Sequence, residues 1–362
     1  MKVHFLTGFP GFITSELIKE LIREGKSKLF YVLVLPEQVD LAKRKADSII
    51  MELDSKHSIN IVAGDITKPN LGMNEEIIKE LHEEQLTVWH LAAIYDLAVK
   101  EELAWKVNVE GTIVVNEFVR SHPDILRYMY FSTAYVAGKR EGRLLETELI
   151  RPTSFKNHYE ETKFEAELLV EELKEQVAVT IIRPGIVRGH SETGETIKFD
   201  GPYFFMNMID RLKWLPMTPY IGKSEAFLNV VPIDYIMSAS VYLSSHSEAE
   251  SQTIHLTDPN PHPIEEIYRA MVFEVTGKNP KGRFPEVLAA TALKSKRIQQ
   301  MLGVEAETLG YLSWNAMFDT TIAERLLQES GIQCADFIQS IPAMTVFYNQ
   351  HKNNADYHIK IV

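Results

Sequence analysis

The chain has 362 residues, of which 45% are hydrophobic and 24% are charged, with a formal net charge of −12. This composition is that of an ordinary globular protein of one large domain with additions, or of two domains. The acidic balance argues against nucleic acid as the main partner, because duplex binding depends on cationic contacts to phosphates. The single cysteine, Cys334, excludes a disulfide framework and a Cys-based zinc site.

Targeting and membrane signals are the next features that the sequence excludes. No apolar run reaches membrane-spanning length, and the chain enters its first predicted strand at once, which leaves no room for a signal peptide. The 12 histidines show no persuasive metal-ligand spacing. We therefore expect a cytoplasmic protein with no membrane span and no metal, and we leave its oligomeric state open.

The first predicted element is a buried strand that ends in a glycine turn. An apolar run from residue 3 leads into Gly8 and Gly11, and residues 14–22 have helical apolar spacing. A strand, a glycine turn and a helix in this order aim backbone N–H groups at a phosphate. Gly8 would let the chain reverse, and Gly11 would let the backbone approach a pyrophosphate. A full dinucleotide fingerprint has a third glycine, and Thr14 stands in its place.

Strands and helices then alternate along the chain. Further strands are predicted at residues 29–35, 59–63, 87–93, 128–131, 179–182 and 253–256. The predicted helices include one that ends near residue 55, and others over 75–84, from about Ala98 to Ser121, and around 159–163. The alternation predicts right-handed βαβ units and an α/β fold, a doubly wound parallel sheet of the Rossmann type.

The regular alternation stops after residue 189. Residues 190–228 are rich in Gly, Pro, aromatic residues and Met. From residue 258 the chain looks mainly helical, with amphipathic segments near 264–276, 286–302 and 319–331. We predict a dinucleotide-binding domain over residues 1–257, with 190–228 inserted toward the substrate, and a smaller helical substrate-side subdomain over 258–362.

Candidate chemistry lies on the helix around residue 160. A spacing of four places the Tyr159 phenol and the Lys163 ammonium on one face. A carbonyl that accepts hydride needs a proton donor beside its oxygen. A phenol has a pKa near ~10, and a nearby ammonium lowers that pKa toward neutrality. Thr133, at the carboxyl end of a predicted strand where ligands bind in such sheets, could hold the same oxygen.

Motifs along residues 2–235 resemble those of an extended short-chain dehydrogenase/reductase. Within that superfamily they are similar to the NAD(P)-binding domain of fatty acyl-CoA reductases and carrier-protein thioester reductases. The matching motifs are LTGxxGF (6–12), YVLV (31–34), GDITKPNLG (64–72), HLAA (90–93), NVxGT (108–112), FSTAYVxG (131–138), YxxxK (159–163), RPxxV (183–187) and VPIDY (231–235).

The resemblance implies a role for each matching residue. Thr133, Tyr159 and Lys163 match the catalytic hydroxyl, the proton donor and the lysine, which would also bond the nicotinamide ribose. Asn108 matches an asparagine that supports the lysine through water. The implied cofactor contacts are Gly8, Phe9, Pro10, Gly11, Phe12 and Ile13 at the pyrophosphate, Asp65 and Ile66 at the adenine, Leu91, Ala92 and Ala93 at the ribose, and Pro184, Gly185, Ile186 and Val187 at the nicotinamide.

The choice between NADP(H) and NAD(H) depends on the residues after the second strand. Related thioester reductases often have an arginine directly after this strand to hold the 2′-phosphate, and Leu35 stands there instead. Arg44 matches a second basic position. Glu37 could accept hydrogen bonds from an unphosphorylated ribose. The resemblance favours NADP(H) over NAD(H).

The expected function is NADP(H)-dependent reduction of an acyl thioester, on CoA or on a carrier protein, to an aldehyde or an alcohol. The aromatic and Met-rich stretch 203–217 suits an apolar chain. One alternative is a hydroxyl/ketone oxidoreductase of the hydroxysteroid or dihydroflavonol type, which would use the same residues. The other alternative is a non-catalytic dinucleotide-binding sensor.

Overall fold

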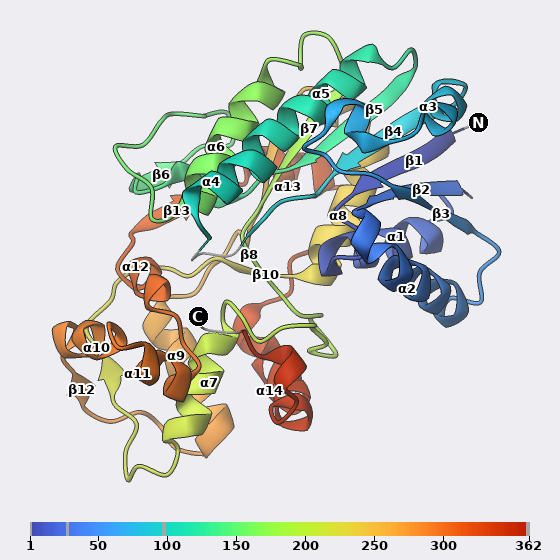
Figure 1. Ribbon diagram of the computed structural model, residues 1–362. Helices are drawn as coiled ribbons and strands as arrows, with labels where there is room; N and C mark the ends of the chain where they lie inside the picture. The colour runs from blue at the N-terminus through green and yellow to red at the C-terminus, as the bar shows by residue number, and fades with distance from the viewer. Residues whose placement is uncertain (1, 27–28, 96–98, 360–362) are drawn as a thin grey trace.

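A seven-stranded parallel sheet forms the centre of the computed structural model, which describes residues 2–26, 29–95 and 99–359 (Figure 1). The strands are β1 (Lys2–Thr7), β2 (Leu29–Val34), β3 (Ser58–Ala63), β4 (Gln85–His90), β5 (Ile125–Phe131), β7 (Val179–Pro184) and β11 (Thr253–Leu256). Their order is β11-β7-β5-β4-β1-β2-β3, and each neighbouring pair runs parallel. The chain order reverses between β1 and β4, which is where ligands bind in such sheets. The predicted doubly wound, Rossmann-type architecture is confirmed.

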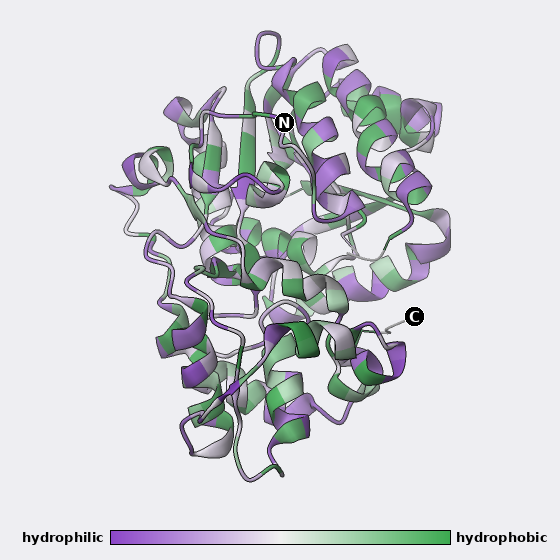
Figure 2. Ribbon diagram, turned by 90° about the vertical axis from the view of Figure 1, so that its left-hand side faces the viewer, coloured by the Kyte–Doolittle hydropathy of each residue, from purple (hydrophilic) through white to green (hydrophobic). Residues whose placement is uncertain are grey.

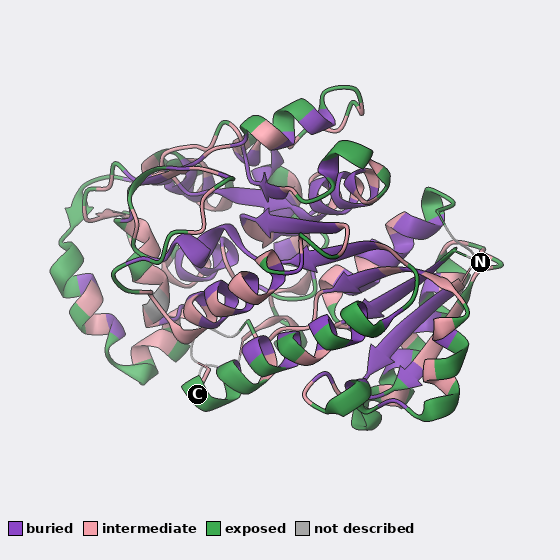
Figure 3. Ribbon diagram, turned by 90° about the horizontal axis from the view of Figure 1, so that it is seen from above, coloured by how far each residue is buried: buried purple, intermediate pink, exposed green. Residues whose placement is uncertain are grey.

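Two hydrophobic cores cover the two faces of this sheet. One core holds buried residues of α1 (Phe12–Arg23), α2 (Val39–Glu52), α8 (Ile233–Ser245) and α13 (Thr321–Leu327). The other holds buried residues of α3 (Glu75–His82), α5 (Gly111–Ser121) and α6 (His158–Glu171). Successive strand residues point to opposite faces, so Phe5 joins one core and Leu6 the other. Figure 3 shows buried strands between helices whose outer sides are exposed.

The predicted helix from about Ala98 to Ser121 is interrupted, and Ala98 itself lies outside the described residues. Its described part consists of α4 (Glu101–Ala104), a π-helical turn over Trp105–Glu110, and α5. Turns of this kind occur mostly as single insertions in α-helices, frequently at functional sites.

A third hydrophobic core lies beside the sheet domain, at the lower left of Figure 1. It is built by α7 (Tyr203–Leu212), α9 (Ile264–Thr276), α10 (Glu286–Leu293), α11 (Lys296–Leu302), α12 (Leu309–Leu312) and α14 (Phe337–His351). The short strands β9 (Tyr220–Ile221) and β12 (Arg283–Phe284) pair with each other there. The helix predicted over 286–302 is therefore two helices. Hydrophobic and hydrophilic residues alternate along the helices, as Figure 2 shows.

The C-terminal part of the chain does not stay within this third core. Strand β13 (Ala316–Phe318) pairs with β6 (Gly142–Leu144), and α13 packs on β11 and α8. Leu326 and Leu327 of α13 are buried in a core of the sheet. Helix α13 thus packs on the seven-stranded sheet and β13 forms a separate two-stranded sheet with β6, although the proposed division at residue 258 assigned both to the helical subdomain. The division itself stays a proposal.

The segment that joins the two parts leaves the sheet after β7. Strand β8 (Ile186–Arg188) pairs with β10 (Val230–Pro232) in a separate two-stranded sheet. In the described part of the chain, no helix has both the length and the apolar character needed to cross a bilayer.

Candidate active site

The turn between β1 and α1 depends on its two glycines. Gly8 has a φ of +92°, and a Cβ there would lie 3.0 Å from the backbone nitrogen of Ala92. A Cβ on Gly11 would lie 2.7 Å from the carbonyl oxygen of Gly8. Thr14, which replaces the third glycine, is buried and its hydroxyl donates to the carbonyl of Thr7 at 3.4 Å. The Thr14 side chain therefore packs against Gly8 inside the turn.

The same turn presents backbone to an anion. Phe9 is buried in a core, whereas Pro10, Phe12 and Ile13 are partly exposed and Gly11 is exposed. No side chain caps the start of α1 at Gly11. The first N–H groups of a helix have no partner inside the helix and attract negative charge. The turn therefore fits the pyrophosphate of a dinucleotide.

The loop after β4 lies directly against this turn. The backbone N–H groups of Leu91 and Ala92 donate to the hydroxyl oxygen of Thr7 at 3.2 and 3.1 Å. Ala93 follows and is partly exposed. The structure thus brings the predicted ribose-contacting residues next to the predicted pyrophosphate turn.

The predicted adenine and 2′-phosphate residues lie near the ends of β2 and β3. The Asp65 carboxylate accepts hydrogen bonds from the backbone N–H of Thr67 at 2.9 Å and from its hydroxyl at 2.8 Å. The Ile66 side chain is buried against Gly111. After β2, Leu35 and Glu37 are exposed. Arg44 is exposed on α2, within the helix rather than at the strand end.

Residues 184–187 form the point where the chain leaves the sheet. Pro184 is the last residue of β7, while Ile186 and Val187 belong to β8. A Cβ on Gly185 would lie 2.7 Å from the side-chain oxygen of Asn229, so this close approach requires glycine.

Tyr159 and Thr133 come together at the carboxyl end of β5. The Thr133 hydroxyl acts on the ionisation of Tyr159, which puts the two hydroxyls near each other, and the Thr133 oxygen accepts from the backbone N–H of Tyr135 at 3.3 Å. Burial raises the pKa of Tyr159; the Thr133 hydroxyl lowers it, and the nearby Glu160 and Tyr95 raise it further. The Tyr159 phenol is therefore protonated at neutral pH and available as a donor.

Lys163 contacts β5 instead of the Tyr159 hydroxyl. Its ammonium donates to the Tyr130 hydroxyl at 2.8 Å and to the Phe131 carbonyl at 2.7 Å. Burial lowers the pKa of Lys163 to about 7, and the Glu167 carboxylate opposes this shift. The sequence predicted that Lys163 would lower the pKa of Tyr159; instead burial raises that pKa, and the side chains that also shift it are Thr133, Glu160 and Tyr95.

Asn108 lies in the π-helical turn and is buried. Its amide oxygen accepts from the backbone N–H of Ile94 at 2.8 Å, and its amide nitrogen donates to the Ile94 carbonyl at 3.1 Å and to the Thr162 hydroxyl at 3.0 Å. Asn108 thus ties the loop after β4 to α6, one residue before Lys163. Its water-mediated support of the lysine stays a prediction.

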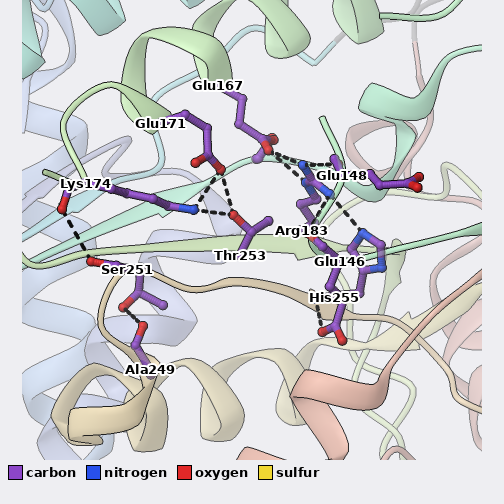
Figure 4. Close-up of polar contacts among 12 residues, drawn as sticks. Glu146, Glu148, Glu167, Glu171, Lys174, Arg183, Ala249, Ser251, Thr253 and His255 are labelled. Atoms are coloured by element: carbon purple, nitrogen blue, oxygen red, sulfur yellow. Dashed lines mark hydrogen bonds and ion pairs between the residues drawn. The ribbon is translucent and has the colours of Figure 1, made fainter. Parts of the chain in front are cut away.

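A buried ion pair, which the sequence reasoning missed, lies behind Thr133. Arg183 donates to one oxygen of Glu167 from two nitrogens, at 2.8 and 2.5 Å (Figure 4). The second oxygen of Glu167 accepts from the Ser132 hydroxyl. Arg183 also donates to the Glu148 carbonyl at 2.9 Å. One signal was available, since residues 159, 163 and 167 share one helix face.

A phenol and a strand-end hydroxyl that meet beside a glycine turn, in a sheet of this topology, identify the class of protein. The fold and the site are of the extended short-chain dehydrogenase/reductase type. A family model described as Male sterility protein matches residues 6–240, more than half of the chain. The chain belongs to that family.

Individual relatives agree with this assignment. The chain is 27% identical over 255 residues to the non-canonical nonribosomal peptide synthetase cpsA of Aspergillus campestris. The matched region covers 66% of this chain and 24% of that protein. The chain is 24% identical over 270 residues to the fatty acyl-CoA reductase wat of Drosophila melanogaster, covering 65% and 52%. The chain thus spans about half or less of these two curated relatives.

Solved structures extend the similarity to nearly the whole chain. The terminal R domain from the myxalamid PKS-NRPS biosynthetic pathway superimposes with a TM-score of 0.83 at 26% identity, covering 99% of this chain and 93% of that one. A thiolation-reductase di-domain from an archaeal non-ribosomal peptide synthetase superimposes with a TM-score of 0.74 at 20% identity, covering 97% and 76%. The latter likeness concerns the fold alone.

Proposed function

We propose that the protein reduces an acyl thioester, bound to CoA or to a carrier protein, to an aldehyde or an alcohol with NADP(H). The proximity of the Tyr159 and Thr133 hydroxyls at the carboxyl edge of the sheet carries this proposal. Two donors at one point suit an oxygen that becomes negative as its carbonyl is reduced. The relatives named as an R domain and as a fatty acyl-CoA reductase favour a thioester as the substrate.

In this proposal each residue of the site has a defined task. The bound dinucleotide supplies the hydride. The backbone of residues 8–13 holds its pyrophosphate, Lys163 orients the nicotinamide ribose, and residues 184–187 border the nicotinamide. Thr133 holds the substrate oxygen, and Tyr159 transfers its proton to that oxygen. A thioester that gains one hydride and one proton becomes a hemithioacetal, which releases the thiol and leaves an aldehyde; a second reduction gives the alcohol.

NADP(H) is proposed over NAD(H) because of Arg44. Its exposed guanidinium on α2 is available to a 2′-phosphate. Glu37, exposed just after β2, would favour the unphosphorylated ribose instead. If Arg44 binds the phosphate, Arg44→Ala should raise KM for NADPH and leave KM for NADH unchanged. An equal change in both KM values would contradict this assignment.

The test of the proposed function is a single substrate screen on the purified full chain. NADPH and NADH oxidation is followed with long-chain acyl-CoA, an acyl-carrier thioester, and a panel of ketones. Consumption with a thioester supports the proposal, whereas consumption with ketones alone would establish the hydroxyl/ketone alternative.

Replacing the proton donor separates an enzyme from a sensor. We expect Tyr159→Phe to lower kcat by at least about 100-fold, since a positioned general acid contributes 10²–10⁴-fold. Cofactor affinity, measured by quenching of tryptophan fluorescence, should stay within about twofold because Phe keeps the ring. The protein would be a sensor if it bound the dinucleotide but turned over none of these substrates, and if the wild type and Tyr159→Phe behaved identically.

A further inference from the structure

The side chain that holds Lys163 is the phenol of Tyr130, which no sequence motif singled out. The Tyr130 ring lies beneath the ammonium, with 4.3 Å between Nζ and the ring centroid, and its hydroxyl accepts the 2.8 Å hydrogen bond. Tyr130 is fully buried on β5, and Lys163 is buried on α6. Hydrogen bonds to a charged donor are strong, and a cation over an aromatic face adds to them when water is excluded.

We propose that Tyr130 is a positioning residue for Lys163, and that the Tyr130 ring, packed on the His90 ring, joins this lysine to the buried hydrogen bonds of the cofactor-binding turn. The proposal rests on the proposed function, in which Lys163 orients the nicotinamide ribose. It adds a residue that touches neither substrate nor cofactor and acts through the lysine.

The His90 ring connects Tyr130 to a buried set of hydrogen bonds. The Tyr130 and His90 rings pack together with 5.6 Å between their centroids, and beside His90 the Thr112 hydroxyl donates to the Asn108 carbonyl at 2.6 Å. Thr112 therefore accepts from His90 Nε2 at 3.1 Å, which makes the Nε2–H tautomer the one present. His90 Nδ1 then accepts from the Thr7 hydroxyl at 2.8 Å.

These hydrogen bonds end at the glycine turn. The Thr7 oxygen receives the backbone N–H groups of Leu91 and Ala92, and Thr7 precedes Gly8 directly. Burial, followed by the charge of Lys163, lowers the pKa of His90 to about 3, so this imidazole is neutral and can serve as an acceptor. The position of the lysine and the shape of the turn are thus set by one buried network.

The groups that face the Lys163 ammonium come from both elements packed around it. From the sheet these are Tyr130 and His90, and from α6 it is Glu167. Tyr130 is the one among them that bonds the ammonium directly. Removing its hydroxyl should therefore disfavour the charged lysine.

The test compares Tyr130→Phe with Tyr128→Phe in the full chain. Tyr128 lies two residues earlier on β5, is equally buried, and uses its hydroxyl on Asn116 at 3.0 Å instead of on Lys163. Each variant loses one buried phenolic hydroxyl from the same strand and keeps the ring. The ionisation of Lys163 is measured by NMR of ¹⁵N-labelled lysine side chains with NADPH bound, and its signal is assigned by comparison with Lys163→Met. The pH dependence of kcat is measured for the same variants.

We expect Tyr130→Phe to lower the proton affinity of Lys163 about tenfold, which is the size of one hydrogen bond to a charged group. The Lys163 titration and the basic limb of the kcat profile should both move about one pH unit lower. Tyr128→Phe should leave both unmoved, whatever it does to the melting temperature. An unmoved titration in Tyr130→Phe, or equal shifts in both variants, would overturn the proposal.

A second variant and the NMR titration test the role of Tyr130 even if Tyr130→Phe does not fold or the wild type has no thioester activity. If Tyr130→Phe does not fold, 3-fluorotyrosine placed at Tyr130, whose hydroxyl is a weaker acceptor, should shift the Lys163 titration in the same direction; no shift there rejects the role of Tyr130. If the wild type turns over no thioester, the proposed function fails, yet the NMR titration still tests the role of Tyr130.

Discussion

Replacing Arg183 by methionine should destabilise the protein by about 3–5 kcal/mol, because it leaves Glu167 as a buried charge without its cation. The two side chains are 3% and 0% exposed, so solvent cannot replace the lost partner. Methionine fills much of the volume of the arginine stem, which keeps the contribution of a cavity small.

The contacts of Arg183 explain why the expected loss is large. Its guanidinium supplies two of the hydrogen bonds to Glu167, at 2.8 and 2.5 Å, and a third bond to the Glu148 carbonyl. Glu167 in turn receives the Ser132 hydroxyl, next to Thr133. The loss should therefore include loosening of the strand end that carries Thr133, and kcat should fall together with stability.

Urea denaturation followed by circular dichroism measures the effect, and the chain offers a matched control. Arg151 and Glu165 form an ion pair with two hydrogen bonds, at 2.5 and 2.9 Å, but the arginine side chain is 54% exposed. Arg151→Met should cost less than about 1 kcal/mol. Changing both Arg183 and Glu167 to methionine should recover part of the loss of Arg183→Met. Equal losses for Arg183→Met and Arg151→Met would refute the reasoning.

Two further predictions concern the glycine turn and the lysine. Gly8→Ala should weaken dinucleotide binding at least about tenfold, because the new Cβ meets the loop after β4 and φ is +92°. Gly25→Ala, also at positive φ but with nothing within 4 Å, should leave binding unchanged, and equal affinities in the two variants would contradict this. Burial lowers the pKa of Lys163 to about 7, so between pH 7 and about 10 the unfolded chain binds a proton that the folded protein has lost. The free energy of unfolding should therefore rise with pH over this range relative to Lys163→Met, and parallel stability curves would show that the lysine keeps its proton when folded.

Most strands of the sheet were predictable from sequence because each is a short run of apolar residues between polar helical segments. Such a run is buried on both faces within a parallel sheet, so its own residues specify it, whereas the edge strand β3 exposes Ser58 and Ala63. The helix predicted over 264–276 also has the bounds predicted for it. Helix 286–302 does not, because the chain leaves the helix at Lys294 and Ser295 and a second helix begins at Lys296.

The candidate site divides in the same way. Spacing along one helix places Tyr159 and Lys163 on a common face, and the order of strand ends brings Thr133 to the same edge; both follow from local periodicity and sheet topology. The partner of the lysine follows from neither. Tyr130 lies on β5 and Lys163 lies on α6, so their contact depends on how the strand and the helix pack against each other.

The sequence by itself thus determined the class of fold, the glycine turn, and the residues offered to the chemistry, because each of these depends on neighbours along the chain. Only the tertiary structure shows the raised pKa of Tyr159, the partners of Lys163 and the Glu167–Arg183 pair. It alone also shows that part of residues 316–327 packs on the sheet. Each of these depends on desolvation and on contacts between segments far apart in the chain, which periodicity does not encode.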